Sequence, residues 1–234
     1  AGVRRVEAVY PVLEAMQRHD LPLLVHGEVT DPAVDVFDRE AVFIERTLAP
    51  LVARFPGLRV VLEHVTTAQG VDFVRTARPG VAATVTAHHL LLSRNALFEG
   101  GLRPHHYCLP VLKRERHRQA LLAAATGADA RFFLGTDSAP HPRADKEHAC
   151  GCAGIYTARD ALGLYAEAFE AAGALDRLGD FASRRAAAFY GWPVSTATVT
   201  LERRARQVPA ALALGADQAL VPMRAGSAVA WQVV

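Results

Sequence analysis

The chain has 234 residues, of which 51% are hydrophobic and 21% charged, and its formal net charge is +2. Because the 26 basic and 24 acidic residues are spread along the chain, this balance argues against nucleic acid or an anionic membrane as a partner. The longest uncharged apolar stretches fall well short of the ~20 residues that a membrane span needs. The composition is typical of a globular protein with a buried core.

The first half of the chain alternates between helical and strand-like patterns. Apolar residues at 6, 9, 13 and 16 recur at helical spacing and predict a helix at about 3–19. The same reading predicts further helices at about 38–54 and 68–77, and strands at 22–26, 58–64 and 81–86.

The second half continues the alternation after an irregular segment at 93–112. The predicted elements are a helix at 113–126, a strand at 131–136, a loop at 138–157, helices at 158–172 and 178–190, and strand-like pieces such as 228–234. Strands that are apolar throughout and alternate with helices are typical of a parallel sheet covered on both faces. Four core strands fit an open sheet or half of a closed eight-stranded barrel, which takes about 250 residues.

Three ionisable side chains follow predicted strands at the point where each strand ends. His26 and His64 each follow an apolar run, and Asp137 follows the run 131–134. Each has a simpler interpretation alone, as a hydrogen-bonded structural histidine or as an aspartate that caps a turn. Because the carboxyl ends of parallel strands meet at one edge of a sheet, the three together predict a site for zinc or a similar divalent ion.

The remaining histidines give weaker indications. For His88 and His89 we expect a wall or hydrogen-bonding role, because adjacent residues cannot place both rings in one site. His117 lies among basic residues and is expected on a solvated helix face.

The three cysteines are too few, and odd in number, for a disulfide framework. Cys108, Cys150 and Cys152 indicate reduced thiols in a cytoplasmic enzyme. A zinc site made by these cysteines is disfavoured, since structural zinc sites usually have two-residue spacers and a fourth ligand.

Seven motifs are distributed over nearly the whole chain. They are LLVHGEV at 23–29, FDRE at 37–40, EHVTT at 63–67, RPHHYCLP at 103–110, GTDSAPH at 135–141, KE at 146–147 and CGCAG at 150–154. Together they resemble the dihydroorotases, in particular the bacterial homodimeric type within the amidohydrolase superfamily. The aspartate motif with its trailing lysine is highly specific.

The resemblance implies a metal-dependent (β/α)8 barrel of the TIM type, a homodimer and a cytoplasmic location. The four predicted strands would be the fifth to eighth of the barrel, so the chain would form its C-terminal half. Residues 1–193 would belong to the barrel, and 194–234 would form an extension that packs on it. The complete protein would bind two zinc ions per subunit.

The resemblance also implies roles for individual residues. His26 and His64 would bind one zinc ion, and Asp137 would bind the other and shuttle the proton. His141 would contact the substrate carboxylate, His26 would lie near the substrate, and Leu109 and Ala153 would meet its ring through backbone groups. The implied reaction is the reversible hydrolysis of (S)-dihydroorotate to N-carbamoyl-L-aspartate in pyrimidine synthesis. Hydrolysis of an unactivated amide fits metal coordination, which lowers the pKa of water from about 15.7 to about 7.

The sequence departs from the family pattern in two places. It has no His-x-His pair, and no lysine precedes Lys113, so the carboxylated lysine that bridges the metals in this family is missing. We therefore expect the chain to be a fragment that binds metal weakly and is inactive alone. Two alternatives stay open: another cyclic amidohydrolase acting on hydantoin or allantoin, and a non-catalytic structural or regulatory homologue.

Overall fold

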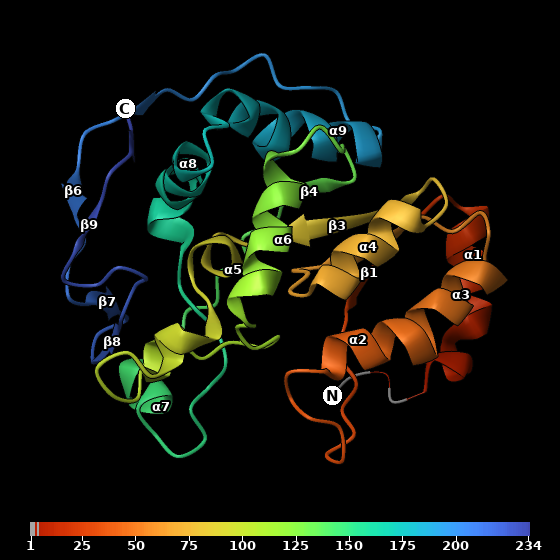
Figure 1. Cartoon of the computed structure of the whole chain (residues 1–234), viewed down its shortest axis with the longest axis horizontal. Helices are drawn as coiled ribbons and strands as arrows, with labels where there is room; N and C mark the ends of the chain where they lie inside the picture. Colours follow the sequence, from red (N-terminus) through yellow and green to blue (C-terminus); the bar gives the residue numbers. More distant parts are fainter. Residues whose placement is uncertain (1–2, 4) are drawn as a thin grey trace.

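Four parallel strands form the central sheet of the computed structural model, which describes residue 3 and residues 5–234 (Figure 1). The strands lie side by side in chain order, so each pairs with the next one in the sequence. They are β1 (Leu23–His26), β2 (Val60–Glu63), β3 (Val81–Val85) and β4 (Phe132–Leu134). All carboxyl ends therefore point to the same edge, as the sequence predicts.

The sheet is apolar because both faces of its inner strands are covered. One face belongs to the large core beneath the helices, and the other carries Val61, Ala82 and Phe133, which pack against Phe189 and its helical neighbours. Strand β1 is different, since Leu24 on it remains 51% exposed. Continuous burial of β2 and β3 explains their unbroken apolar sequences.

The helices that precede β2 and β3 begin and end close to their predicted bounds. The N-terminal helix is shorter than expected, and residue 4 of the predicted range lies outside the described part. The elements are η1 (Val6–Val9), α1 (Tyr10–Arg18), α2 (Arg39–Phe43), η2 (Ile44–Leu48), α3 (Ala49–Arg54) and α4 (Ala68–Thr76). Segment η2 is a π turn just before Pro50. Proline has no backbone N–H to donate within a regular helix, so an irregular turn at this point accommodates it.

Two short helices form where the sequence predicts none, one between the third predicted strand and the irregular segment 93–112 and one inside the predicted loop 138–157. They are α5 (Ala87–Leu91), which holds His88 and His89, and α7 (Arg143–Lys146) in the loop after β4. The other helical elements are η3 (Arg94–Leu97), η4 (Pro104–His106), α6 (Glu115–Thr126), η5 (Ala158–Asp160), α8 (Ala161–Ala171), η6 (Leu175–Arg177), η7 (Asp180–Arg184) and α9 (Arg185–Tyr190). Helices of four or five residues are too short to produce a periodic pattern.

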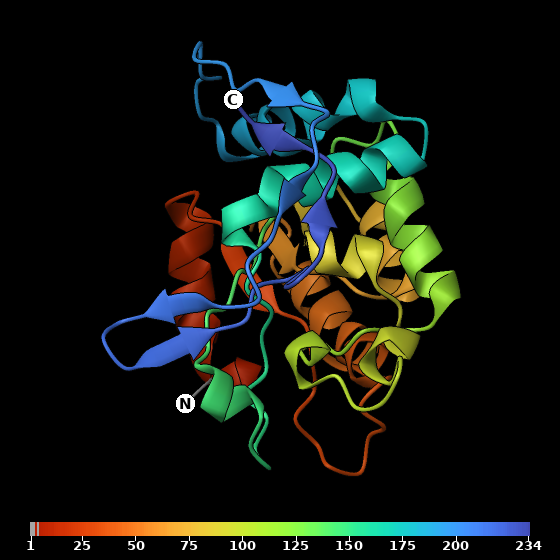
Figure 2. The same ribbon diagram turned by 90° about the vertical axis from the view of Figure 1, so that its left-hand side faces the viewer.

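The C-terminal tail crosses one side of the molecule, where its last strands lie against α8 (Figure 2). It forms three small antiparallel pairs, β10 with β5, β6 with β9, and β7 with β8. The strands are β5 (Leu201–Glu202), β6 (Arg206–Gln207), β7 (Leu212–Leu214), β8 (Gln218–Leu220), β9 (Ala228–Val229) and β10 (Gln232–Val233). Within residues 3 and 5–234, every helix is too short or too polar to cross a membrane.

Candidate functional site

Ionisable side chains gather at the carboxyl ends of β1, β2 and β4. His26 ends β1 and pairs in register with Glu63, which ends β2, and His64 follows directly. The Nδ1 atom of His26 lies 3.1 Å from the Nε2 atom of His64, and the rings meet edge to face. Asp137 lies beyond the end of β4, close enough for the charge of His26 to affect its pKa. The three predicted ligands thus share one edge of the sheet.

The two imidazoles fit a single zinc ion. Two nitrogens bound at about 2.0–2.1 Å to a tetrahedral ion are about 3.3 Å apart, close to the 3.1 Å between these rings. A ligand histidine must be neutral, and burial, with a smaller effect of His26, lowers the pKa of His64 to about 4. The Nε2 atom of His26 meets the Glu28 carboxylate at 3.0 Å, a usual outer partner of a metal-binding histidine.

The backbone at His64 and Asp137 lies in the left-handed region. The φ angles are +42° and +40°, values that are uncommon for residues other than glycine. Such conformations cost about 1–3 kcal/mol each and persist where the surroundings hold them in place. Thr84 on β3 supports His64, because its Oγ1 accepts the His64 N–H at 2.7 Å and donates to Glu63 Oε2 at 2.6 Å. Gly135 lies against this threonine, and a Cβ there would come within 2.5 Å of the Thr84 Cβ.

The carboxyl group of Asp137 is suited to proton transfer. Partial burial raises the pKa of Asp137, and His26 opposes that rise. Burial also raises the pKa of Glu63, which the Thr84 hydrogen bond opposes and the charge of Asp137 reinforces. A carboxyl with a raised pKa exchanges its proton more readily near neutral pH.

Three of the four predicted substrate contacts, Leu109, His141 and Ala153, lie outside strands and helices, and the fourth, His26, ends β1. The Nε2 atom of His141 lies 3.0 Å from the carbonyl oxygen of Ala153, so these two residues are neighbours. Gly154 follows with φ of +149°, and a Cβ there would lie 2.9 Å from the His141 ring. The Gly154 N–H donates to the Tyr107 carbonyl at 3.0 Å, which joins this segment to the one that carries Leu109.

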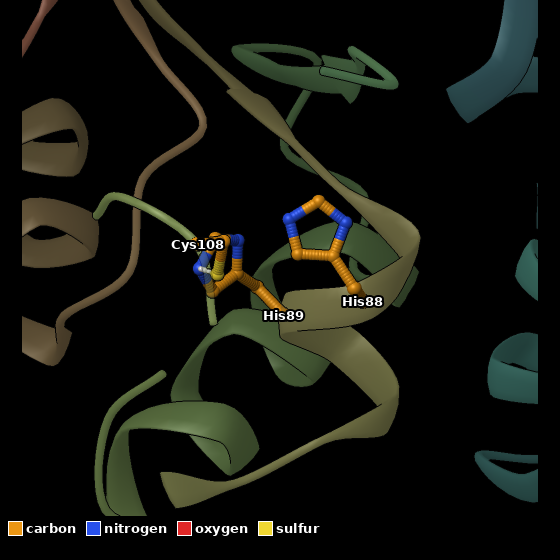
Figure 3. A group of neighbouring side chains, drawn as sticks. All are labelled: His88, His89 and Cys108. Carbon is orange, nitrogen blue, oxygen red and sulfur yellow. Dashed lines mark hydrogen bonds between the residues drawn. The ribbon is translucent and has the colours of Figure 1, made fainter. Parts of the chain in front are cut away.

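His88, His89 and Cys108 form a second, fully buried group, with ligand atoms within 4.8 Å of one another (Figure 3). Both ring nitrogens of His89 are engaged, because Nε2 donates to the Pro110 carbonyl and Nδ1 accepts from the Thr86 hydroxyl. Burial raises the pKa of the Cys108 thiol to about 12, which keeps it protonated at neutral pH. His89 therefore has its predicted hydrogen-bonding role, whereas both ring nitrogens of His88 are buried without a hydrogen-bond partner among the described residues.

The chain is similar to known proteins over nearly its whole length. The sequence profile of the Amidohydrolase family matches residues 5–205. The chain belongs to the amidohydrolase family. A curated dihydroorotase of Cupriavidus taiwanensis is 63% identical over 232 residues, which make up 99% of this chain and 67% of that protein.

The solved structures that resemble this chain include dihydroorotases and, at lower sequence identity, hydantoinases. A dihydroorotase from Saccharomyces cerevisiae, crystallised in complex with 5-fluoroorotic acid, superposes with a TM-score of 0.90 at 33% identity; the match covers 100% of this chain and 69% of that one. An L-hydantoinase from Arthrobacter aurescens superposes with a TM-score of 0.79 at 17% identity, and the match covers 97% of this chain and 58% of the hydantoinase chain. At this identity the similarity shows a shared fold alone. This amidohydrolase is a cyclic amide hydrolase of the dihydroorotase type.

The first lysine in this sequence, Lys113, makes a hydrogen bond to the backbone two residues before it. Lys113 is buried, and its Nζ donates to the carbonyl oxygen of Val111 at 3.0 Å. Burial lowers the pKa of Lys113, and the charge of Glu40 opposes this. Lys113 is thus engaged by the backbone of its own segment.

Glu40 is a supporting residue to which the sequence pattern assigns no role. It is 1% exposed and accepts the N–H groups of Thr66 and Thr67, both at 2.8 Å, and their two hydroxyls. These bonds fix the turn that follows His64. Its helical spacing is the signal in the sequence that indicates burial, since Glu40 lies four residues before Ile44 and so on the apolar face of the helix.

The prediction for His117 is wrong. The residue is 8% exposed, and its Nδ1 accepts the Ala68 N–H at 3.0 Å, at the start of α4. Its neighbours Arg114 and Arg116 are exposed, but the helical repeat turns His117 to the same side as the buried Leu121 and Ala124.

Proposed function

We propose that this amidohydrolase catalyses the reversible, zinc-dependent hydrolysis of (S)-dihydroorotate to N-carbamoyl-L-aspartate. The observation that carries the proposal is the pair of His26 and His64, with nitrogens 3.1 Å apart at the same sheet edge as Asp137. The yeast relative was crystallised with 5-fluoroorotic acid, an orotate analogue, and this supports a substrate of the same ring type.

His26 and His64 would hold one zinc ion, and Asp137 would hold the second. When bound, zinc lowers the pKa of water from about 15.7 to about 7 and polarises a carbonyl oxygen. Glu28 orients the His26 ring, and Thr84 fixes the backbone at His64. These contacts place the two rings before any ligand arrives, which reduces the free energy needed for ordering.

Asp137 would move the proton in this reaction. Its raised pKa suits a group that takes a proton from the attacking water and returns it to the ring nitrogen as the amide bond opens. His141 would bind the substrate carboxylate, while backbone groups of Leu109 and Ala153 would hold the ring. The contact between His141 and the Ala153 carbonyl would hold these two substrate-binding residues at a fixed distance from each other.

The wider assembly is part of the same proposal. The four parallel strands would be half of an eight-stranded barrel, with β1 pairing to a further strand at the edge where Leu24 is exposed. Residues 1–193 would form the barrel part and 194–234 the extension, in a cytoplasmic homodimer. The His-x-His pair and the bridging carboxylated lysine would complete the metal site from outside the present sequence.

The test compares two proteins in a dihydroorotate assay. One is the 234-residue chain, and the other is a completed protein, in which this chain is joined to the part of the Cupriavidus taiwanensis relative that it does not match. We expect activity and two tightly bound zinc ions in the completed protein, and little of either in the chain alone. A completed protein that folds but leaves dihydroorotate unchanged would contradict the proposal.

A substrate panel separates the alternatives. Hydrolysis of hydantoin or allantoin in preference to dihydroorotate would favour the hydantoinase-like alternative, which the fold-level similarity to the Arthrobacter enzyme keeps open. Inactivity on all three substrates, with normal folding, would favour a structural or regulatory role.

A further inference from the structure

Lys146 lies at the end of α7 with its ammonium group enclosed by backbone carbonyls. The side chain belongs to a residue that is 3% exposed. Its Nζ donates to the carbonyl oxygens of Tyr107 at 2.7 Å, Cys152 at 2.9 Å and Gly154 at 2.7 Å. An ammonium has three N–H donors, so all three are used and the charge is compensated by oriented carbonyl dipoles.

The three carbonyls come from the two segments that carry the proposed ring contacts. Leu109 follows Tyr107 by two residues, and Ala153 lies between Cys152 and Gly154. The segments are also joined directly, since the Gly154 N–H donates to the same Tyr107 carbonyl that accepts from Lys146. Neither segment has regular secondary structure between 107 and 110 or between 150 and 154. The ammonium thus ties together two stretches of backbone that no strand or helix holds.

The residue type at this position is informative in an arginine-rich chain. Only two of the 26 basic residues, Lys113 and Lys146, are lysines, and both are buried. The chain uses arginine for a carbonyl cluster elsewhere, where Arg185 donates to the carbonyls of Ala125, Gly127 and Phe132. A guanidinium suits acceptors spread along its planar fork, whereas a compact ammonium suits acceptors grouped around one point.

We propose that Lys146 is a positioning residue for the substrate. It sets the separation between the backbone at Leu109 and the backbone at Ala153, and so shapes the gap that receives the ring. The inference rests on the proposed dihydroorotase function, because the ring contacts are part of it. Loss of the ammonium removes this donor from the carbonyls of Cys152 and Gly154, leaves the Tyr107 carbonyl with the Gly154 N–H alone, and lets the segments separate. Misplacement of about 1 Å can cost a factor of about 100 in rate.

The experiment replaces Lys146 by methionine, which keeps much of the length of the side chain without its donors. In the completed protein we expect Lys146→Met to lower kcat/KM roughly 10- to 100-fold, mainly through KM. Lys146→Arg keeps the charge but not the shape of the ammonium. We expect its KM to stay closer to that of Lys146→Met than to that of the parent protein. The matched control is Arg143→Gln, one turn earlier on α7, where the side chain is exposed; it should leave both constants unchanged.

A second measurement does not need activity. In the 234-residue chain, the Gly154 amide should exchange with deuterium faster in Lys146→Met than in the unchanged chain, while amides of β2 and β3 keep their rates. If KM stays within twofold of the parent and Gly154 exchange is unchanged, the proposal is overturned. If the completed parent protein is inactive, the dihydroorotase proposal fails, and the exchange rates still decide the role of Lys146. Should the methionine variant not fold, Lys146→Gln, with two N–H donors, is measured in the same way.

Discussion

Two regions of this amidohydrolase contribute to one site, and they are held by different means. The strand-end region contains His26, His64 and Asp137, and its geometry follows from parallel strands in fixed register. The loop region contains Leu109 and Ala153 with their flanking segments, which are joined by a buried ammonium and by the bond from the Gly154 N–H to the Tyr107 carbonyl. Under the proposed function, the sheet would position the groups that carry out the chemistry, and the loops would position the substrate.

The largest expected effect is at Asp137. In the completed protein, Asp137→Asn should lower kcat by about 10²- to 10⁴-fold, because the amide cannot take up the proton that the reaction transfers. Steady-state kinetics on dihydroorotate check this. The comparison of regions requires that KM change much less than kcat, and a variant in which only KM rises would contradict it.

The stability of the turn that follows His64 should depend on Glu40. We expect Glu40→Gln to lower the free energy of unfolding by about 2–4 kcal/mol, because a side-chain amide group cannot accept the N–H and hydroxyl donors of Thr66 and Thr67 at both atoms. Urea denaturation measures the change. Glu45→Gln on the exposed side of the same helix is the control, and it should stay within about 0.5 kcal/mol.

The histidines of the strand-end region should make stability depend on pH. The folded chain holds the pKa of His64 at about 4, mainly through burial, whereas an unfolded histidine titrates near about 6.5. As pH falls from about 6.5 to about 4, the unfolded chain binds the proton first, and the free energy of unfolding should drop by about 3 kcal/mol. His88, with a pKa of about 3, adds to the same slope. Denaturation at several pH values should show a shallower slope for His64→Asn; an equal slope would argue against this assignment.

Thr84 offers the smallest of these tests. Thr84→Val keeps the shape but removes the hydroxyl that links Glu63 to the His64 backbone, and we expect a loss of about 2 kcal/mol. Thr84→Ser should recover most of it. Thr76→Val on the exposed face of α4 serves as the control, and a loss there as large as at Thr84 would remove any special role for Thr84.

The sequence predicts the strand-end region well because its signals are local. Apolar runs mark the four strands, and His26 and Asp137 stand where those runs stop. The loop region has no such pattern, and its organisation depends on contacts between residues nearly 40 positions apart, as for Lys146 and Tyr107. The predicted exposure of His117 is wrong for a related reason. Charged neighbours in the sequence indicate that one side of the helix is exposed, but they do not show which side His117 faces.

The close approach of Gly135 to Thr84 has a consequence for how such proteins can change over time. A methyl group at 135 would overlap the Thr84 side chain, its Cβ included, so even serine at 84 would not make room for it. Glycine at 84 would make room, but it gives up the bonds to Glu63 and to the His64 backbone. The glycine therefore cannot change first without cost, and a lineage that keeps threonine or serine at 84 is expected to keep the glycine with it.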